Sequence, residues 1–562
     1  MVFRIRGMNM AKIIKVNYHD LETVGFNSGV SLKEISEYFQ DRYNYPILVG
    51  MVDNAITELN ESITRSCKVD FYDRSSGLGN GIYGRTTQFM LIVAVKKLLG
   101  ANIEVIIDYS IDKGYYCEIK GIDIDKPIVK KLEKQMKEIC KQNYIINKVS
   151  VSRFDAIKFF KQKKQMDKVK VLKYISNSYI NLYRIDDIYD YFYGELAYST
   201  GQIDDFKLTY IKGNGFVLSY PDTYNPECTL DYVHHRMLFE AFQNYAEWCD
   251  KIKIRNAADL NEVVSSGKYN ELIRLCETYY NNQLSNIAET IYQNRNTVKL
   301  VLIAGPSSAG KTTTSKKLET YLESKGITTH QISIDDYFFD RSKTPVLENG
   351  ELDTESLNAV DVTLFNKHLT KLFEGEKVEL PEYNFIQGKR EYRGKVLQLK
   401  ENDVIIIEGL HALNEDLTIS IERKQKFKIY INALTQLNID NHNRIHTSDT
   451  RKLRRIVRDN KYRNYNASDT LNMWKNIREG EEKYIFPYQD DADCIINSAL
   501  IYELGILKTY AEPLLFSVAE TDPMYSEALR LINFLRNFLP IPSDYIPQDS
   551  VLREFIGGSC FE

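Results

Sequence analysis

The segment Gly305-Pro-Ser-Ser-Ala-Gly-Lys-Thr312 constrains the fold of this chain more than any other feature. It fits the pattern G-x-x-x-x-G-K-[ST], follows the apolar run Lys299–Ala304 and precedes a predicted helix over Thr313–Ser324. Gly305 and Gly310 allow backbone angles that turn successive N–H groups toward an anion, and a helix start adds unpaired N–H groups. We therefore predict a phosphate-binding loop between a buried strand and a helix, in a doubly wound parallel α/β sheet.

The loop residues divide between phosphate and metal contacts. We expect Lys311 to reach the β- and γ-phosphates of ATP, and the hydroxyl of Thr312 to bind Mg²⁺. A chance match is on the order of one in a hundred for a chain of this length, before the strand and helix are counted. The predicted nucleotide contacts in the loop are Gly305, Pro306, Ser307, Ser308, Ala309, Gly310, Lys311, Thr312 and Thr313.

Two further strand-like segments end in carboxylates. Thr328–Ile334 is followed by Asp335 and Asp336, and Val404–Ile407 is followed by Glu408. Ligands of open α/β sheets lie at the carboxyl ends of the strands, so Asp335 is a candidate base for an acceptor hydroxyl. Glu408 occupies the position of a Mg²⁺-linked acid. The plainer alternatives are that the aspartates cap a turn and that Glu408 is only solvated.

A basic helix follows this sheet pattern. Arg451, Arg454, Arg455 and Arg458 recur at i, i+3, i+4 and i+7, which places four guanidiniums on one face, with Lys461 and Arg463 beyond them. Such a face suits the negative charge of a transferring phosphoryl group. The alternative is a solvated face paired with acids such as Asp449 and Asp459.

Taken together and in this order, the motifs resemble the phosphoribulokinase/uridine kinase family of P-loop kinases over about residues 298–500. The segments that carry the resemblance are the P-loop, Ser333–Phe338, Glu382–Phe385, Ile407–Gly409, Arg451–Asp459 and Asp491–Ile496. The resemblance implies a kinase that transfers the γ-phosphoryl group of ATP, with Mg²⁺, to the 5′-hydroxyl of a pyrimidine nucleoside.

The resemblance also assigns roles to single residues. The implied catalytic residues are Asp335, Lys311 and Arg454; further nucleotide contacts are Arg451 and Arg458; the metal-linked residues are Thr312, Glu408 and Asp335; the substrate residues are Tyr337, Glu355, Tyr383 and Arg390.

Two positions depart from the family. Glu355 stands where uridine kinases usually carry Asp, and Gly388 stands where they usually carry a His that recognises the pyrimidine edge. A pocket that recognises its substrate by hydrogen bonds loses discrimination when such a group is missing. The stretch Gln387–Arg390 or another acceptor remains an alternative, and His411 is a candidate for the lining of the site.

The N-terminal half shows a different pattern. Strands predicted at Lys12–Asn17, Tyr45–Asn54 and Lys68–Tyr72, with a capped helix over Leu32–Tyr43, are similar to a β-grasp TGS domain. Residues 75–285 resemble the second additional domain of threonyl-tRNA synthetases, with helices predicted over Thr86–Leu99 and Pro127–Gln142 and a long helical stretch over Leu230–Gln293 that breaks near Asn256.

The metal site of that synthetase domain is expected to be lost. Its paired histidines align with Arg85 and Phe89, and the adjacent His234 and His235 have poor geometry for one metal. We therefore expect no stoichiometric zinc.

Composition limits the remaining choices. The 562 residues carry a net charge of −4, so no global basic field attracts nucleic acid or anionic lipid, and the apolar runs are too short to span a bilayer. The eight cysteines lack metal-site spacing and residues 1–16 lack a signal core, so we expect a cytoplasmic protein. The predicted domains are a TGS-like domain at 1–72, an editing-like α+β domain at 73–285, a P-loop domain at 286–500 and a helical extension at 501–562.

Three functions remain open at this stage. The first is an ATP-dependent kinase for uridine or cytidine. The second is a kinase for another small hydroxyl compound, such as a different nucleoside, a sugar or pantothenate. The third is an RNA-associated, nucleotide-dependent regulatory protein that contacts RNA or a protein partner through its N-terminal half. The oligomeric state stays open, with homo-oligomers common among uridine kinases.

Overall fold

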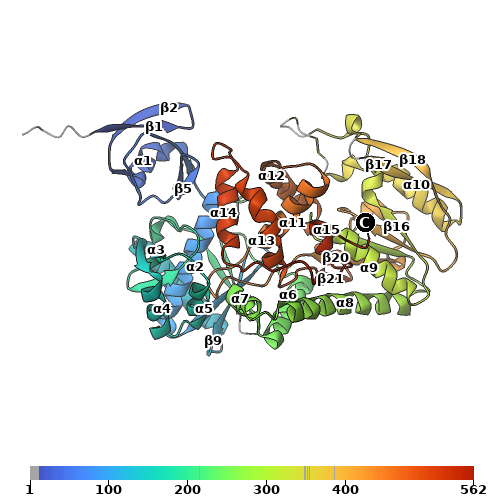
Figure 1. Cartoon of the computed structure of the whole chain (residues 1–562), viewed down its shortest axis with the longest axis horizontal. Coiled ribbons are helices and arrows are strands. Elements are labelled where there is room, and N and C mark those ends of the chain that lie inside the picture. The colour runs from blue at the N-terminus through green and yellow to red at the C-terminus, as the bar shows by residue number, and fades with distance from the viewer. Residues whose placement is uncertain are drawn as a thin grey trace, which may run out of the picture.

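The computed structural model describes residues 12–213, 215–346, 350, 352–353, 355–384 and 387–561. The interpretations that concern residues 1–11 and Phe385 lie outside the described residues. The N-terminal five-stranded sheet lies at one end of an elongated molecule, and the parallel sheet lies at the other (Figure 1).

The N-terminal domain is a five-stranded sheet of order β2-β1-β7-β4-β5 with one helix packed on it. Ser31 and Glu34 form the predicted capping box, and the helix ends at Phe39, where a short 3₁₀ turn continues to Arg42. The elements are β1 Ile13–Tyr18, β2 Glu22–Asn27, β3 Val30–Ser31, α1 Leu32–Phe39, β4 Val49–Val52, β5 Ala55–Thr57, β6 Ser62–Ile63 and β7 Cys67–Tyr72.

The second region holds a four-stranded sheet of order β13-β14-β9-β8 and a three-stranded sheet β10-β11-β12. Its elements are α2 Gly77–Leu99, β8 Glu104–Ile111, β9 Gly114–Lys120, α3 Lys126–Gln142, β10 Asn147–Ser152, α4 Arg153–Gln162, α5 Met166–Lys173, β11 Tyr179–Ile185, β12 Ile188–Tyr191, β13 Lys207–Ile211 and β14 Gly215–Ser219.

Helix α2 begins nine residues before the predicted start at Thr86. Ser76 caps it, and two glycines of its first turns, Gly79 and Gly84, have close neighbours that leave no room for a side chain. A Cβ on Gly79 would meet the carbonyl oxygen of Asp73 at 1.9 Å, and one on Gly84 would meet the Tyr220 hydroxyl at 2.5 Å. Tight packing, which the sequence pattern does not display, therefore explains the glycines.

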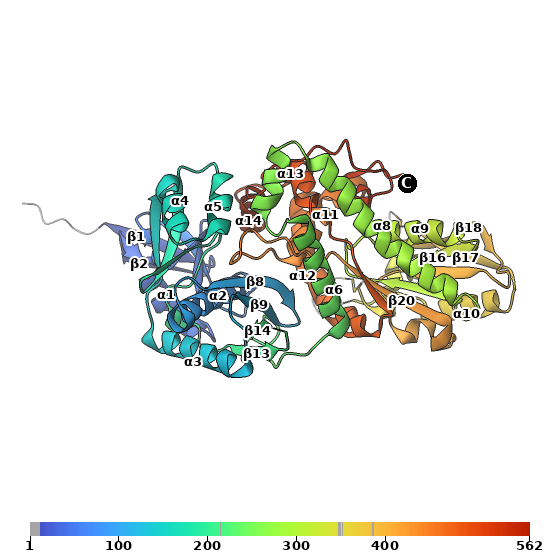
Figure 2. The same ribbon diagram turned by 90° about the horizontal axis from the view of Figure 1, so that it is seen from below.

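The predicted helical stretch is divided into α6 Arg236–Ile252, α7 Ala257–Ser265 and α8 Tyr269–Gln293. The break near Asn256 is confirmed, because Asn256 is the N-cap of α7. Helix α8 lies diagonally across one face of the parallel sheet (Figure 2) and packs on α9.

The parallel sheet has the order β16-β19-β15-β20-β21, with every neighbouring pair parallel. This confirms the doubly wound α/β prediction. Its elements are β15 Leu300–Ala304, α9 Lys311–Glu323, β16 Thr329–Ser333, η3 Ile334–Tyr337, α10 Val362–Phe373, β17 Val378–Asn384, β18 Lys389–Leu397, β19 Val404–Glu408, β20 Lys426–Asn432, α11 Thr447–Tyr462, α12 Ala467–Tyr484 and β21 Cys494–Asn497.

The C-terminal extension consists of α13 Glu503–Phe516, α14 Tyr525–Leu535 and a mostly irregular tail that contains the short helix α15 Arg553–Ile556. It does not form a core of its own. Val551, Leu552 and Phe555 are fully buried in the same cluster as Ile303 of β15. The last residues thus belong to the core behind the P-loop, and they lie beside α9 (Figure 1).

The segment between β20 and α11 connects the two halves of the chain. Asn438 donates through Nδ2 to the carbonyl oxygens of Ile107 and Asp108, at 3.2 and 2.9 Å. Farther along, Lys168 is fully buried and pairs with Asp440 at 2.7 Å. Buried charges of this kind are retained only when they are paired, so the halves are tied together by specific polar contacts.

Among the helices in the described ranges, none combines the length and the apolar composition that crossing a bilayer requires.

Candidate nucleotide-binding site

The loop between β15 and α9 has the backbone geometry of an anion cradle. Ser308 and Gly310 have φ angles of +60° and +89°. A Cβ on Gly305 would meet the carbonyl oxygen of Ile431 at 2.0 Å, so only glycine fits there. The Nζ of Lys311 donates to the carbonyl oxygens of the loop itself, at 3.0 Å to Gly305 and 3.3 Å to Pro306. The lysine is therefore held over the loop.

Two strands on one side of β15 carry the predicted carboxylates at or just after their ends, beside this loop. β19 lies between β15 and β16, and Glu408 at its end is in register with Ile303 of β15 and Ser333 of β16. The hydroxyl of Thr312 donates to Oε1 of Glu408 at 3.4 Å. Asp335 follows β16 directly. The carboxyl ends of the strands thus bring the loop and both acids together.

The protonation of the two acids reflects this crowding. Burial raises the pKa of Asp335, against the lowering effect of the positive charges of Lys311, Arg463 and Arg458. Burial and the nearby charge of Asp335 raise the pKa of Glu408 to about 7. Perturbed carboxyls in contact with an anion cradle are typical of functional sites.

The tyrosines predicted to contact substrate take different positions. Tyr337 is 1% exposed, packs edge-on against Phe365 and is hydrogen-bonded through its hydroxyl to His368 at 3.1 Å. This places the ring in the core beneath the site. Tyr383 is partly exposed, and its backbone N–H donates to Asp336 at 3.1 Å. Asp336 therefore anchors β17 and does not line the phosphate loop.

Arg390 lies opposite Tyr383 on β18, and both of its terminal nitrogens donate to Asp361 at 3.1 Å. The guanidinium is thus held in place beside the β17–β18 hairpin. Gly388 lies in the turn of this hairpin with a φ angle of +65°. The departure from the usual His therefore coincides with a backbone conformation that favours glycine.

Glu355 lies near the site, against helix α12. Its Oε2 is buried without a hydrogen-bond partner. Burial raises the pKa of the carboxyl to about 7, although the nearby positive charges of Arg455 and Lys311 act in the opposite direction. Helix α12 approaches this residue closely at Gly480, where a Cβ would meet that of Glu355 at 2.7 Å. Burial lowers the pKa of His411 to about 4, so this neighbour of the Glu355 backbone is neutral at pH 7.

The predicted row of arginines on α11 falls into two buried side chains, Arg451 and Arg454, and two partly exposed ones, Arg455 and Arg458. Arg451 is 2% exposed, forms a two-pronged pair with Glu481 and donates to the carbonyl of Ser307 at 3.1 Å. Arg454 is fully buried and donates to Glu503 at 2.6 Å. Helix α11 packs on the loop and on α13, so these two side chains support the loop from behind.

Three further arginines, Arg455, Arg458 and Arg463, lie nearer to the site. Arg455 donates to the hydroxyl of Ser307 at 2.5 Å, and Arg458 pairs with Asp459 at 2.9 Å. Arg458 and Arg463 lie near enough to Asp335 to lower the pKa of its carboxyl. Positive charge from Arg458 and Arg463 is therefore concentrated near Asp335, and Arg455 contacts the loop at Ser307.

Two acids at the loop were not anticipated from the sequence. Glu481 on α12 accepts the N–H of Ser307 at 3.2 Å as well as the guanidinium of Arg451. Glu554 on α15 accepts both the N–H and the hydroxyl of Thr313, at 3.1 and 2.9 Å. Neither residue carries a local signal, because each depends on a long-range contact.

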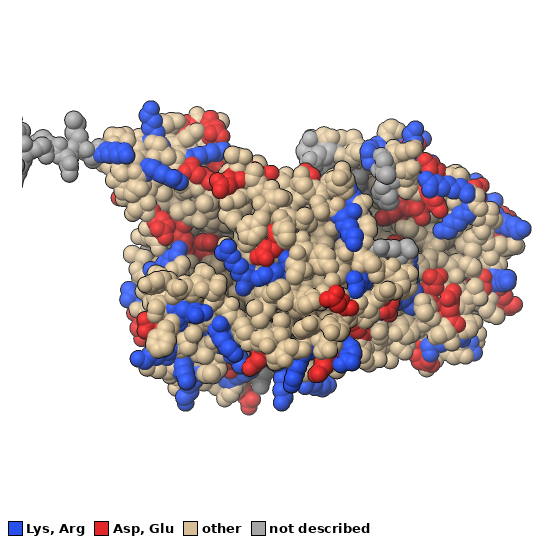
Figure 3. Space-filling model, in the orientation of Figure 1, with Lys and Arg blue, Asp and Glu red and all other residues tan. Residues whose placement is uncertain are grey.

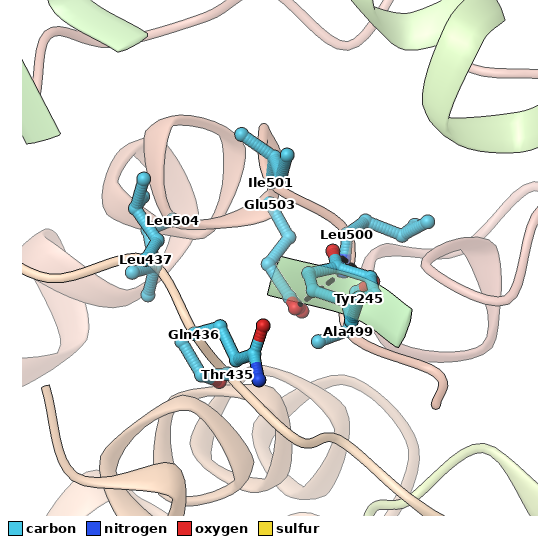
Figure 4. A pocket seen from close by; sticks show the side chains of 9 residues that line it. All are labelled: Tyr245, Thr435, Gln436, Leu437, Ala499, Leu500, Ile501, Glu503 and Leu504. Atoms are coloured by element: carbon cyan, nitrogen blue, oxygen red, sulfur yellow. Dashed lines mark hydrogen bonds between the residues drawn. The ribbon is translucent and has the colours of Figure 1, made fainter. Parts of the chain in front are cut away.

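A small cavity (Figure 4) lies between α6, the segment after β20 and the start of α13. One of its lining residues is Glu503, the partner of Arg454. Apolar side chains dominate the rest of the lining, and no P-loop residue contributes to it. The lining residues are Tyr245, Thr435, Gln436, Leu437, Ala499, Leu500, Ile501, Glu503 and Leu504.

In the N-terminal half, the two positions aligned with metal-binding histidines have other contacts. Arg85 donates to the carbonyl of Glu195 at 3.0 Å, and Phe89 is fully buried. His235 pairs with Asp490 at 2.6 Å. Across the part of the chain that the structure describes, there is no cluster of three His, Cys, Asp or Glu side chains suited to a metal ion.

Comparison with known proteins divides the chain in the same way. Residues 300–502 match the profile of the Phosphoribulokinase / Uridine kinase family. Over 202 residues, the chain is 29% identical to a uridine kinase of Staphylococcus epidermidis, a span that covers 36% of this chain and 88% of that enzyme. The stretch that matches the family profile contains the P-loop, both strand-end acids and the arginine helix.

The N-terminal half is similar to threonine–tRNA ligases. The chain is 27% identical over 206 residues to that of Acetivibrio thermocellus, which covers 36% of this chain and 32% of the ligase. The chain thus spans about a third of the length of these relatives. A solved structure described as a "Possible Uridine Kinase" from Bacillus stearothermophilus is 21% identical, covers 38% of this chain and 97% of its own, and has a TM-score of 0.27.

Proposed function

We propose that this chain is an ATP-dependent kinase that phosphorylates the 5′-hydroxyl of a pyrimidine nucleoside, uridine or cytidine. The observation that carries the proposal is the meeting of the P-loop with Asp335 and Glu408 at the ends of three adjacent parallel strands. A P-loop alone binds a nucleotide, whereas a P-loop beside a strand-end acid can also activate an acceptor.

In this proposal the acceptor hydroxyl oxygen forms a bond to the γ-phosphorus while the bond from that phosphorus to the β–γ bridging oxygen breaks. Asp335 accepts the hydroxyl proton, and ADP leaves. Its raised pKa brings the carboxyl nearer to working pH, as a proton acceptor requires. Arg455, Arg458 and Arg463 surround the transferred group, and Lys311 holds its oxygens.

The oxygen ligands available around Thr312 fit a magnesium ion. The hydroxyl of Thr312 and the carboxylate of Glu408 are hard oxygen ligands 3.4 Å apart, with Asp335 nearby. Mg²⁺ prefers such oxygens together with nucleotide phosphates. When bound, the ion would neutralise charge on the β- and γ-phosphates.

A different small hydroxyl compound remains the nearest alternative acceptor. Gly388 places no side chain where a pyrimidine-recognising group is usual, and Arg390 is committed to Asp361. Glu355 and Tyr383 are the polar groups that we propose for contact with the sugar or base.

Release of ADP in the presence of Mg²⁺ and ATP tests the proposal. The acceptor panel should include uridine, cytidine, purine nucleosides, simple sugars and pantothenate. We expect turnover with uridine or cytidine that exceeds the acceptor-free rate by orders of magnitude. Turnover with another acceptor would support the second kinase hypothesis, and slow hydrolysis unaffected by every acceptor would support a nucleotide-dependent switch.

A contact with RNA is a second candidate function, favoured by a local concentration of charge. Residues 126–173 hold 14 lysines and one arginine against four acidic residues, although the whole chain is acidic. Figure 3 shows several basic side chains, with a few acidic ones among them, over the region of α4 and α5. Phe154 and Tyr179, 76% and 69% exposed, lie beside this surface as stacking platforms. Its exposed lysines include Lys158, Lys161, Lys163 and Lys164.

Salt dependence of RNA binding tests this second candidate. Affinity for a structured RNA should fall steeply between 50 and 200 mM salt, with a smaller slope after Lys161, Lys163 and Lys164 are replaced together by Gln. Binding that is insensitive to these substitutions would argue for a protein partner or for none.

We also propose a cytoplasmic location, supported by eight cysteines without disulfides.

A further inference from the structure

The carboxylate of Glu554 occupies the start of the P-loop helix. Its Oε2 accepts the backbone N–H of Thr313 at 3.1 Å and the Thr313 hydroxyl at 2.9 Å. Thr313 is in the first turn of α9, where the N–H groups have no partner within the helix and the dipole is positive. The side chain thus provides an anion to donors that otherwise suit a phosphate.

The backbone of this segment is firmly held. Val551, Leu552 and Phe555 are fully buried, and Val551 packs so closely on the loop that a Cβ on Gly310 would lie 2.3 Å from it. The Nζ of Lys461, at the end of the arginine helix, donates to the carbonyl of Ile556 at 2.8 Å. These contacts hold the backbone of residues 551–556 against the loop. The side chain of Glu554 is the part that can move.

One ion pair and one hydrogen bond to a backbone carbonyl also attach the same segment to α9. Lys317 pairs with Asp549 at 2.8 Å, and Lys316 donates to the carbonyl of Phe561 at 2.6 Å. These contacts lie farther along the helix than Thr313. They can persist whether or not Glu554 stays on the loop, and they supply a matched control within the segment.

A carboxylate and a nucleotide phosphate cannot both use the N–H and hydroxyl of Thr313. Each would also repel the other at short range in a partly buried site. Because α15 is anchored by its apolar side chains, the low-cost way to admit the phosphate is rotation of the Glu554 side chain. The charge of Glu554 also adds to that of Glu408 and Asp335, so the loop is surrounded by acids until a nucleotide and cation enter.

We propose that Glu554 is a built-in competitor of the nucleotide: it closes the P-loop in the empty protein and is displaced from Thr313 when ATP binds. This regulation rests on the proposed kinase function, because it acts on the same nucleotide site. It weakens nucleotide binding without contributing to acceptor recognition. The C-terminal extension would thereby set the ATP concentration at which the protein becomes active.

Nucleotide affinity of the full-length chain tests this proposal independently of any acceptor. Calorimetric titration with a non-hydrolysable ATP analogue and Mg²⁺ should be compared for the wild type, Glu554→Gln, Glu554→Ala and the control Asp549→Asn. We expect Glu554→Ala to bind about tenfold more tightly, because it no longer breaks a charge-assisted contact on binding. Glu554→Gln should be intermediate, since it loses the charge but keeps an oxygen, and Asp549→Asn should match the wild type.

Thermal unfolding gives a second measurement. Glu554→Ala should melt slightly below the wild type without nucleotide, yet gain more stability from a saturating analogue, because ligand stabilisation grows with affinity. Equal or weaker binding by both Glu554 variants, with normal binding by the wild type, would overturn the proposal and make Glu554 part of the nucleotide site. Absence of binding in every protein would instead overturn the proposed function, and this inference with it.

Discussion

Arg454 donates through Nη1 to the carbonyl oxygen of Ser308 at 3.3 Å, a contact between the arginine helix and the phosphate loop that is fully buried. The same guanidinium pairs with Glu503 of the C-terminal extension. One side chain thus joins the loop, α11 and α13. A residue so placed acts on the shape of the loop, whereas Arg458, on the same helix, remains accessible to the site.

We therefore predict that Arg454 and Arg458 fail in different ways when substituted. Arg454→Met should destabilise the protein by about 3–5 kcal/mol, because Glu503 is left as a buried, uncompensated charge. Chemical denaturation measures this loss directly. Arg454→Met with wild-type stability and strongly reduced turnover would instead return Arg454 to a catalytic role.

The matched variant is Arg458→Gln. It should retain most of the stability but lower kcat at least tenfold, since a charged donor near the transferred group is removed while the fold keeps its buried pairs. Steady-state kinetics with saturating nucleotide and acceptor test this. A KM effect alone would place Arg458 in ground-state binding.

A second prediction concerns the proposed base. Asp335→Asn should lower kcat by two to four orders of magnitude, the usual contribution of a proton acceptor, while nucleotide affinity changes only a few-fold. The amide has the size of the acid but cannot accept the proton. Turnover and analogue binding should be measured on the same preparation.

Asp336→Asn is the control for that experiment. Asp336 accepts the backbone N–H of Tyr383, and the amide oxygen of Asn can accept it as well. Turnover should therefore stay within a few-fold of the wild type. If both variants lose activity equally, the pair acts through the local backbone and the assignment of Asp335 as the base is wrong.

A third prediction follows from the pKa of Glu408, which burial raises to about 7 from 4.5. Below pH 4.5 the acid is neutral in both the folded and unfolded states. As pH rises from 4.5 to about 7, the unfolded chain ionises first, so the free energy of unfolding falls, by about 1–3 kcal/mol for this group. Above that range the loss is complete.

Glu408→Gln removes this contribution. Without nucleotide or Mg²⁺, its melting temperature should fall less between pH 5 and pH 7.5 than that of the wild type. Glu355, whose pKa burial also raises to about 7, should sustain part of the fall in both proteins. Parallel melting curves for the two proteins would show that Glu408 ionises normally in the fold.

The success of the sequence-based prediction depended on how local each feature is. The P-loop and the strand-end acids Asp335 and Glu408 are specified by short patterns, and parallel pairing of β15, β16 and β19 brings them together.

The division of the arginines could not be predicted in this way. Periodicity places Arg451, Arg454 and Arg458 on one helical face, but it does not say which end of that face α13 and the last residues cover. The contact of Glu554 with Thr313 joins residues 241 positions apart, and no local pattern encodes it. The early start of α2 was missed because glycines usually weaken helices, and the close packing that requires Gly79 and Gly84 there is not visible in the sequence.

The last prediction concerns Gly388, where a His would be expected in a uridine pocket. The φ angle is +65°, and a Cβ there would lie 2.9 Å from the side chain of Arg341. Gly388→His should therefore lower stability by about 1–2 kcal/mol, through a left-handed backbone and crowding, without raising kcat/KM for uridine. Gly388→Asn, which tolerates this conformation better, separates strain from side-chain chemistry. A His variant that gains uridine turnover while Asn does not would show that the pocket lacks only the imidazole, and that the hairpin can adapt to carry it.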